Sequence, residues 1–351
     1  MRLLTIATIS FTALATAAPA SSLSDEFSSF FAIGDSLTDD GKLVQQVPPS
    51  FGGRFSNGVT YAEILAQEFG AATFNLALGG ATAEDDNEQQ PAFEMSADGA
   101  ALFAAFGTFN NQIDTLTGLV SPLGPLNAVV GDNPLVSVFL GANDLLQDLD
   151  EAIGGARAVG VDAANAVGDG IRRLNSLNSE FDNFLVLNLP NLGDTPLFND
   201  PASSVAPLAG LATQETDAFN NELADIANEL RGEGLNIIEV DVAGFFQDIL
   251  SGAVDLGISD LTSQCIPSFS VFDPTNNCSL VGFDSEGFPI FDIELADDIL
   301  FVDGIHPNRV AQAALADLIE EQLAPVPLPA GLPLLIVGLG AFGLIRRRAH
   351  A

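Results

Sequence analysis

Basic residues are scarce in this sequence, tryptophan is absent and histidine occurs only twice. Lysine occurs once, at Lys42, and 11 basic residues face 47 acidic ones, for a formal net charge of −36. A surface that binds duplex nucleic acid or an anionic membrane needs clusters of Lys and Arg. The composition therefore argues against nucleic acid as a partner. The two histidines are His306 and His350.

The N-terminal segment resembles a secretory signal. Residues 1–20, MRLLTIATISFTALATAAPA, contain Arg2, an apolar stretch and a final Ala-Pro-Ala. This order of features predicts a signal peptide that is cut after Ala20. The alternative is a buried N-terminal helix.

The C-terminal segment resembles a membrane-anchored sorting signal. Residues 328–345 carry no charge and precede three arginines, Arg346 to Arg348. The apolar run is just long enough to cross a bilayer, and the arginines place its end on the cytoplasmic side. Residues 326–330, VPLPA, with the span and the arginines, resemble the PEP-CTERM signal that exosortase-type systems of Gram-negative bacteria recognise. A plain C-terminal anchor is the alternative.

Both end segments predict export to the cell surface or outer envelope, or secretion after processing, with the sorting machinery as a partner. We expect a signal peptide over 1–20, one folded domain over 21–323, and a Pro-rich spacer with a transmembrane tail over 324–351. Removing both ends would leave 47 acidic residues but only seven of the basic ones, because four arginines and no acid lie there.

The chain has only two cysteines, Cys265 and Cys278. In an exported protein such a pair predicts a disulfide. Two cysteines without a nearby histidine cannot complete a zinc site, so metal binding by them is disfavoured.

Short apolar runs alternate with helical patterns along the chain. The helical pattern is clearest over 217–230, where Phe219, Leu223, Ile226 and Leu230 recur on one face, and a second one covers 308–323. Such alternation predicts an α/β domain with a parallel sheet of about five strands covered by helices on both faces. The expected strands cover residues 30–33, 73–77, 135–140, 184–189 and 235–240. Residues 84–107 and 252–300 fit no element.

Chemistry that needs an imidazole has one strong candidate, His306, because His350 lies in the predicted tail. Asp303 lies three residues earlier, where its carboxylate could orient the ring. Ser36 follows the first expected strand, and a serine becomes a nucleophile when such a base takes its proton. Spacing alone leaves a chance Asp-x-x-His pair as the alternative. However, the exits of parallel strands meet at one sheet edge, which could gather all three residues.

Four segments carry a resemblance to a known family. They are IGDSLTDDG at 33–41, NLALGGA at 75–81, GANDL at 141–145 and DGIHPN at 303–308. Their order and spacing resemble the conserved blocks of the GDSL, or SGNH, esterases and lipases. GRFSNGVTYAEILA at 53–66 further resembles the branch with plant GDSL lipases and haemolysin-like bacterial lipases. Tyr61 and Val302 stand where that branch commonly has tryptophan.

The resemblance implies a flavodoxin-like three-layer fold and a serine esterase that needs no metal or organic cofactor. Ser36 would be the nucleophile, His306 the general base and then acid, and Asp303 the group that orients it. The N–H groups of Ser36 and Gly80 and the Asn143 amide would form the oxyanion hole. On residue type alone, Asn143-Asp144 is also typical of a helix N-cap, and the two roles could hold together. No G-x-S-x-G motif surrounds Ser36, which disfavours the α/β-hydrolase fold.

The expected substrate is an ester of a lipid, a small alcohol or an O-acylated polysaccharide. Two alternatives remain open: an acyltransferase with the same site, and a non-catalytic surface-binding protein with the same fold. An intact set of five site residues argues against the second, because binding alone does not require them.

Overall fold

The computed structural model describes residues 26–42, 53–69, 73–88, 97–266, 278, 280–283, 289–291 and 296–323. The predicted signal peptide and sorting tail lie outside these residues. Within the described part of the chain, no helix is both long and apolar enough to cross a membrane.

A five-stranded parallel sheet forms the centre of the domain, as the sequence predicts. Its strands run in the order β2-β1-β3-β4-β5, which is a doubly wound order with a switch point beside β1. Every residue of β1, β3 and β4 is buried, because helices cover both faces of a parallel sheet. The strands are β1 (Ser29–Gly34), β2 (Thr73–Asn75), β3 (Pro134–Phe139), β4 (Asn183–Leu187) and β5 (Asn236–Val240).

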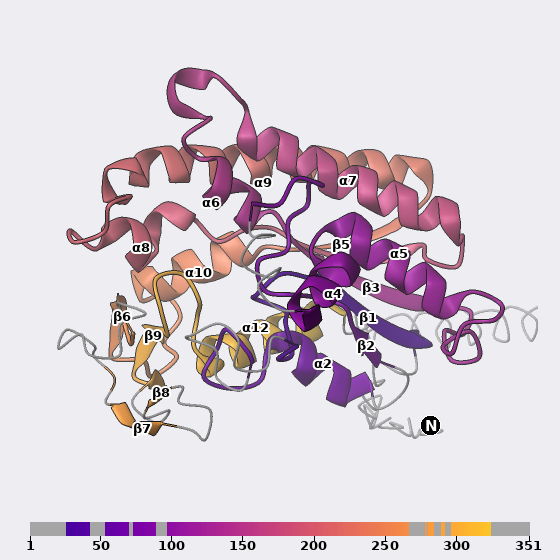
Figure 1. Ribbon diagram of the computed structural model, residues 1–351, viewed down its shortest axis with the longest axis horizontal. Helices are drawn as coiled ribbons and strands as arrows, with labels where there is room; N and C mark the ends of the chain where they lie inside the picture. Colours follow the sequence, from indigo (N-terminus) through magenta and orange to yellow (C-terminus); the bar gives the residue numbers. More distant parts are fainter. Residues whose placement is uncertain are drawn as a thin grey trace, which may run out of the picture. The chain divides into compact units, whose positions relative to one another are not determined.

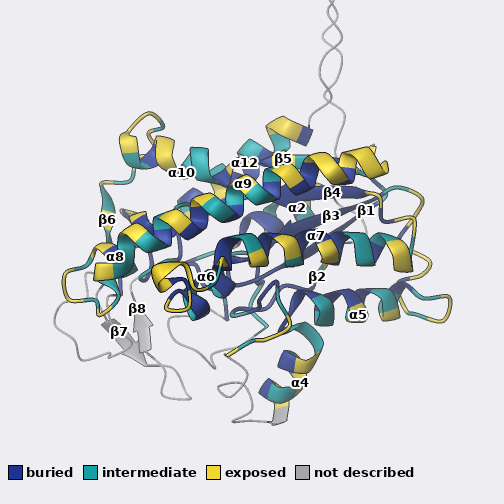
Figure 2. Ribbon diagram, turned by 90° about the horizontal axis from the view of Figure 1, so that it is seen from above, coloured by how far each residue is buried: buried dark blue, intermediate teal, exposed yellow. Residues whose placement is uncertain are grey.

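Helices lie on both sides of this sheet (Figure 1). One layer holds α5 (Phe109–Val120), α7 (Val159–Leu177) and α9 (Ala209–Glu233), which pack side by side. The other holds α2 (Tyr61–Phe69) and α12 (Arg309–Leu323), which contact each other. Figure 2 shows the strands buried beneath α7 and α9, whose outer faces are exposed. The three-layer α/β/α fold is therefore confirmed.

Shorter elements complete the domain near the carboxyl ends of the strands. The remaining helices are α4 (Ala97–Phe106), α6 (Ala142–Asp148), α8 (Pro196–Asn199) and α10 (Val242–Ser251), and the short 3-10 turns are η1 (Ile153–Gly155), η2 (Leu192–Asp194) and η3 (Ala206–Leu208). The additional strands are β6 (Asp260–Gln264), β7 (Leu280–Phe283), β8 (Pro289–Phe291) and β9 (Ile299–Phe301).

The expectation that residues 84–107 and 252–300 contain no regular element is wrong. Helix α4 lies in the first segment, and its apolar residues are too evenly spread to show a helical period. The second segment contributes two small two-stranded sheets, β6-β9 and β7-β8. Three of these four strands have fewer than five residues, which is too short for an alternating pattern.

Candidate active site

Ser36 lies in a tight turn directly after β1. The N–H groups of Thr38 and Asp39 both donate to the Asp35 carbonyl, at 3.1 and 3.0 Å, so the chain reverses as soon as the strand ends. A β-carbon on Gly34 would lie only 2.6 Å from Thr38 Oγ1, so glycine permits this close turn. Ser36 is therefore held at the sheet edge and retains 7% exposure.

Ser36, His306 and Asp303 form a continuous hydrogen-bonded chain. His306 Nε2 lies 2.7 Å from Ser36 Oγ, and His306 Nδ1 lies 2.7 Å from Asp303 Oδ2. Asp303 Oδ1 also accepts the N–H groups of Ile305 and His306, at 2.9 and 2.8 Å. The structure thus brings together three residues that are up to 270 positions apart.

The Asp303 carboxyl is buried, yet it keeps its negative charge. Burial by itself raises its pKa, but the electrostatic interaction with His306 and the hydrogen bonds from its ring and from two N–H groups outweigh burial and hold the pKa below 3.8. An ionised Asp303 fixes a proton on Nδ1 of His306. Nε2 is then free to accept the proton of Ser36 Oγ.

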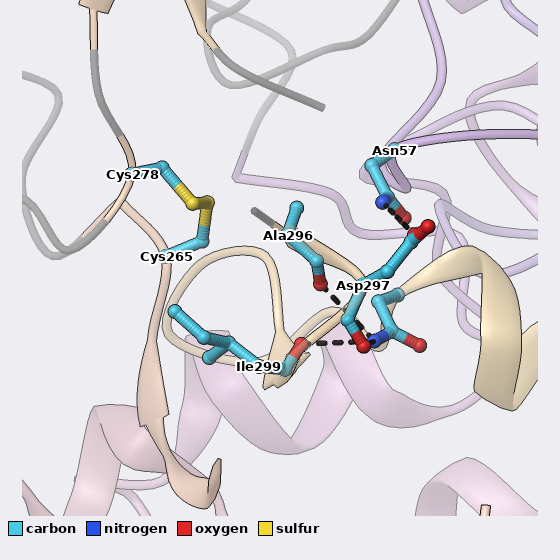
Figure 3. Close-up of a disulfide and its surroundings, with 7 residues drawn as sticks. Asn57, Cys265, Cys278, Ala296, Asp297 and Ile299 are labelled. Atoms are coloured by element: carbon cyan, nitrogen blue, oxygen red, sulfur yellow. Dashed lines mark hydrogen bonds between the residues drawn. A yellow bond between two sulfur atoms is a disulfide. The ribbon is translucent and has the colours of Figure 1, made fainter. Parts of the chain in front are cut away.

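The turn that carries His306 is anchored on both sides. Val302 N donates to His306 O at 2.9 Å, and Asn308 N donates to Leu300 O at 2.8 Å. The Asn308 Nδ2 group donates to the carbonyls of Ala296, Asp297 and Ile299 at 2.9–3.2 Å. Figure 3 shows these carbonyls beside the disulfide.

The imidazole ring of His306 packs on Phe55, with 5.0 Å between ring centroids.

Cys265 and Cys278 form a disulfide, as predicted (Figure 3). Cys265 N donates to Phe301 O at 2.8 Å, and Ile266 N donates to Val302 O at 2.9 Å. The disulfide therefore braces the strand that leads directly into the Asp303–His306 turn.

Asn143 occupies the first turn of α6, but it is not the helix cap. The cap position is Gly141 and has no side-chain cap bond. Asn143 Nδ2 instead donates to the carbonyl of Ala81 at 2.9 Å, which uses one of its two amide hydrogens. The helix-cap interpretation therefore does not describe this side chain.

Gly80 lies in the turn that follows β2, next to the Ser36 turn. Leu78 N donates to Gly34 O at 3.2 Å, which ties the two turns together. Gly80 adopts φ +83°, a conformation that favours glycine. Within the described residues, the N–H groups of Ser36 and Gly80 donate to no protein acceptor. Both donors remain available for another partner.

Asp35 contributes a second buried carboxyl beside the chain of three. Its Oδ1 accepts Leu37 N at 3.0 Å, whereas its Oδ2 has no partner among the described residues. Burial raises its pKa from 3.8 to about 6, partly offset by the Leu37 N–H and the charge of His306. Only one of its two oxygens therefore bonds to an N–H group of the loop.

A pocket of about 270 Å³ opens beside Ser36 and His306. Asn143 also lines it, whereas Gly80 and Asp303 do not. More than half of its residues are apolar or aromatic, and its two charged residues are carboxylates, Asp194 and Asp217. The apolar lining residues are Leu37, Phe139, Ala142, Leu146, Pro190, Leu192, Ala243, Phe246, Leu250, Phe301, Ile305, Pro307 and Leu315.

Sequence reasoning missed two residues that hold this site together. Asn308 lies in the DGIHPN segment, but its contacts across residues 296–299 depend on a fold that spacing does not show. For Asp144, the sequence indicates only a place in the GANDL segment or at a helix cap. Its carboxylate accepts the N–H groups of Ala83 and Glu84, both at 2.9 Å.

The profile of the GDSL-like lipase/acylhydrolase family matches residues 30–319. The chain belongs to this family, and it is therefore a hydrolase of the ester-bond class. A phosphatidylcholine-sterol acyltransferase of Aeromonas hydrophila is 26% identical, with 83% of this chain and 88% of that protein covered.

Solved structures of similar fold include two esterases. A carbohydrate acetylesterase from Sinorhizobium meliloti is 14% identical, covers 84% of this chain and 97% of its own, and has a TM-score of 0.45. A phospholipase A1 from Streptomyces albidoflavus is 16% identical, covers 84% and 98%, and has a TM-score of 0.38.

Proposed function

We propose that this protein is an exported serine esterase in which Ser36 is the nucleophile. The hydrogen-bonded chain of Ser36, His306 and Asp303 carries the proposal. His306 Nε2 takes the proton of Ser36 as Oγ bonds to the acyl carbon. The same nitrogen then protonates the departing alcohol as the carbon–oxygen bond of the ester breaks. Water attacks the acyl-enzyme by the same route and releases the acid.

The tetrahedral intermediate carries a negative oxygen that needs donors. Ser36 N–H, Gly80 N–H and the second amide hydrogen of Asn143 are the groups available beside the nucleophile. Such fixed donors typically contribute roughly 3–4 kcal/mol each to the chemical step.

The pocket favours an acyl chain much longer than acetyl. The pocket of about 270 Å³ is well above the roughly 150 Å³ of an engineered apolar cavity that binds benzene. An acetyl group would leave most of this apolar space unfilled, whereas an octanoyl or decanoyl chain would occupy it. We therefore propose a medium-chain ester, as in a lipid, over an acetylated polysaccharide.

A serine-reactive phosphonate tests the nucleophile. The wild-type protein is expected to take up one phosphonate, at Ser36, and Ser36→Ala to take up none. The control is Ser251→Ala, because Ser251 is an exposed serine at the end of α10. An unlabelled but folded wild-type protein would support a non-catalytic binding protein instead.

Acyl transfer to an alcohol is the second candidate, because the Aeromonas hydrophila relative is named an acyltransferase. Product analysis with an octanoyl ester and an added alcohol separates the two reactions. Hydrolysis yields only octanoic acid, whereas transfer yields the new ester in proportion to the alcohol.

Export and sorting are proposed from the two end segments, and the disulfide supports an oxidising compartment. The FSNG segment, residues 55–58, supports the branch with plant GDSL and haemolysin-like lipases. N-terminal sequencing of the mature protein should begin at Ser21. Mass spectrometry of its C-terminus tests removal of the PEP-CTERM-type tail.

A further inference from the structure

We propose that Asp144 is a positioning residue that fixes the oxyanion donors Gly80 and Asn143 relative to Ser36. The inference rests on the proposed esterase function and adds to it a side chain that touches no substrate. It concerns residues 78–88, which follow β2 and carry Gly80, and which we call the glycine loop.

Asp144 binds the glycine loop with both carboxylate oxygens. Oδ2 accepts Ala83 N and Oδ1 accepts Glu84 N, both at 2.9 Å. Its side chain is fully buried, so water cannot replace either contact. The neighbouring side chain, Asn143, donates to Ala81 O at 2.9 Å. Two successive residues of α6 thus hold the loop within one to four positions of Gly80.

The contacts continue along α6 away from the site. Gln147 accepts Glu88 N at 3.1 Å and donates to Asp86 O at 3.0 Å. Arg157 joins the carboxylate of Glu84, at 2.5 Å, to that of Asp148, at 2.6 Å. The loop is therefore fastened to α6 over its whole later half, and Asp144 is the buried contact nearest to Gly80.

This fastening matters because oxyanion donors act only when they are held in place. A displacement of about 1 Å in a catalytic group can cost about 10²-fold in rate, and productive sites hold their groups within about 0.5 Å. Loosening the loop would move Gly80 N–H directly. It would also move Ala81 O, which orients the Asn143 amide.

The competing explanation makes Asp144 a structural residue only. A carboxylate in the first turn of a helix interacts favourably with the helix dipole. On that account its loss lowers the stability of the domain and leaves the turnover of folded protein unchanged.

Asp144→Asn separates the two explanations. The amide has one acceptor oxygen, so its NH₂ group faces a backbone N–H that formerly had an acceptor. We expect kcat to fall about 10- to 100-fold with KM changed less than threefold. Asp260→Asn is the matched control, because Asp260 Oδ1 accepts two backbone N–H groups, of Thr262 and Ser263, outside the pocket. Its kcat should stay near the wild-type value.

A double-mutant cycle with Asn143→Ala then tests whether both residues act through one oxyanion hole. If they do, the combined loss of kcat is smaller than the product of the two single losses, because only the effect of Asp144 on Gly80 remains once the Asn143 amide is gone. Fully additive losses, or an unchanged kcat in folded Asp144→Asn, would overturn the inference. Phosphonate labelling at Ser36 should persist in Asp144→Asn at a slower rate. A failure of the esterase proposal is seen separately, as absent labelling in the wild type.

Arg157→Gln keeps the inference testable if Asp144→Asn does not fold. Arg157 holds the glycine loop from outside through Glu84, so a several-fold fall in kcat at constant KM is expected. Arg172→Gln is its control, because Arg172 also pairs with carboxylates, Asp169, Glu229 and Glu233, but holds no part of the loop. Equal kcat values for the two arginine variants would contradict the inference.

Discussion

The Asn143 side chain donates a hydrogen bond to the Ala81 carbonyl at 2.9 Å, one residue beyond Gly80. This contact joins α6 to the loop after β2, and the two segments are more than 60 residues apart in the sequence. It also fixes the plane of the amide and leaves its second hydrogen for the proposed oxyanion. The contact explains why an asparagine in this position can serve chemistry while Gly141 occupies the helix cap.

Replacing Asn143 by alanine should impair the chemical step. One fixed donor is lost while Ser36 and His306 stay in contact, so kcat should fall on the order of 10²–10³-fold with KM little changed. Steady-state kinetics and a urea midpoint on the same preparation measure both quantities. An unchanged kcat with a lowered midpoint would refute a role in the oxyanion hole.

The sequence predicts the five strands well because each is a short apolar run, and the central strands β1, β3 and β4 are buried throughout. It also predicts that Ser36, Asn143 and His306 meet, since each segment follows a strand or precedes the last helix. Asp144 could not be found in this way. Its partners lie about 60 positions earlier in the chain, and a buried Asp beside Asn is also typical of a helix start.

The disulfide should stabilise the domain and hold the catalytic turn. Cys265 and Cys278 enclose 13 positions, and breaking such a loop typically costs about 3 kcal/mol of unfolding free energy. The double variant Cys265→Ser, Cys278→Ser should therefore unfold at lower urea. The kcat of the double variant should fall as well, because β9, which the disulfide braces, leads into Asp303. Free-thiol labelling of the exported wild type should find neither cysteine, and a variant of unaltered stability would contradict the structural role.

Asp35 should make the protein less stable as the pH rises. Its pKa is raised from 3.8 to about 6 in the folded state, so the folded protein binds a proton that the unfolded chain releases between these pH values. The contribution of Asp35 to the free energy of unfolding is complete below pH 3.8 and is lost as the pH rises through about 6. The shift in pKa corresponds to roughly 3 kcal/mol of that free energy.

Asp35→Asn tests this linkage, because an amide resembles the protonated carboxyl and cannot ionise. Urea midpoints measured from pH 4 to pH 8 should fall less steeply in the variant than in the wild type. The two proteins should have similar midpoints near pH 4, and the variant should be the more stable one at pH 8. Parallel pH profiles would show that Asp35 does not titrate in this range.

The pocket beside Ser36 should set the acyl-chain preference. With about 270 Å³ lined mostly by apolar side chains, kcat/KM on p-nitrophenyl esters should rise from acetate to octanoate or decanoate and then fall at palmitate. Each methylene that enters the pocket contributes about 0.8 kcal/mol, which corresponds to a severalfold gain per carbon at most.

Ala243 of α10 is a small residue in the lining. Ala243→Phe should therefore fill part of the pocket and move the optimum to shorter esters, with activity on acetate retained. Ala224→Phe is the matched control, because Ala224 lies on α9 and does not line this pocket. A wild-type optimum at acetate, or an optimum that Ala243→Phe leaves in place, would mean that acyl chains do not occupy this pocket.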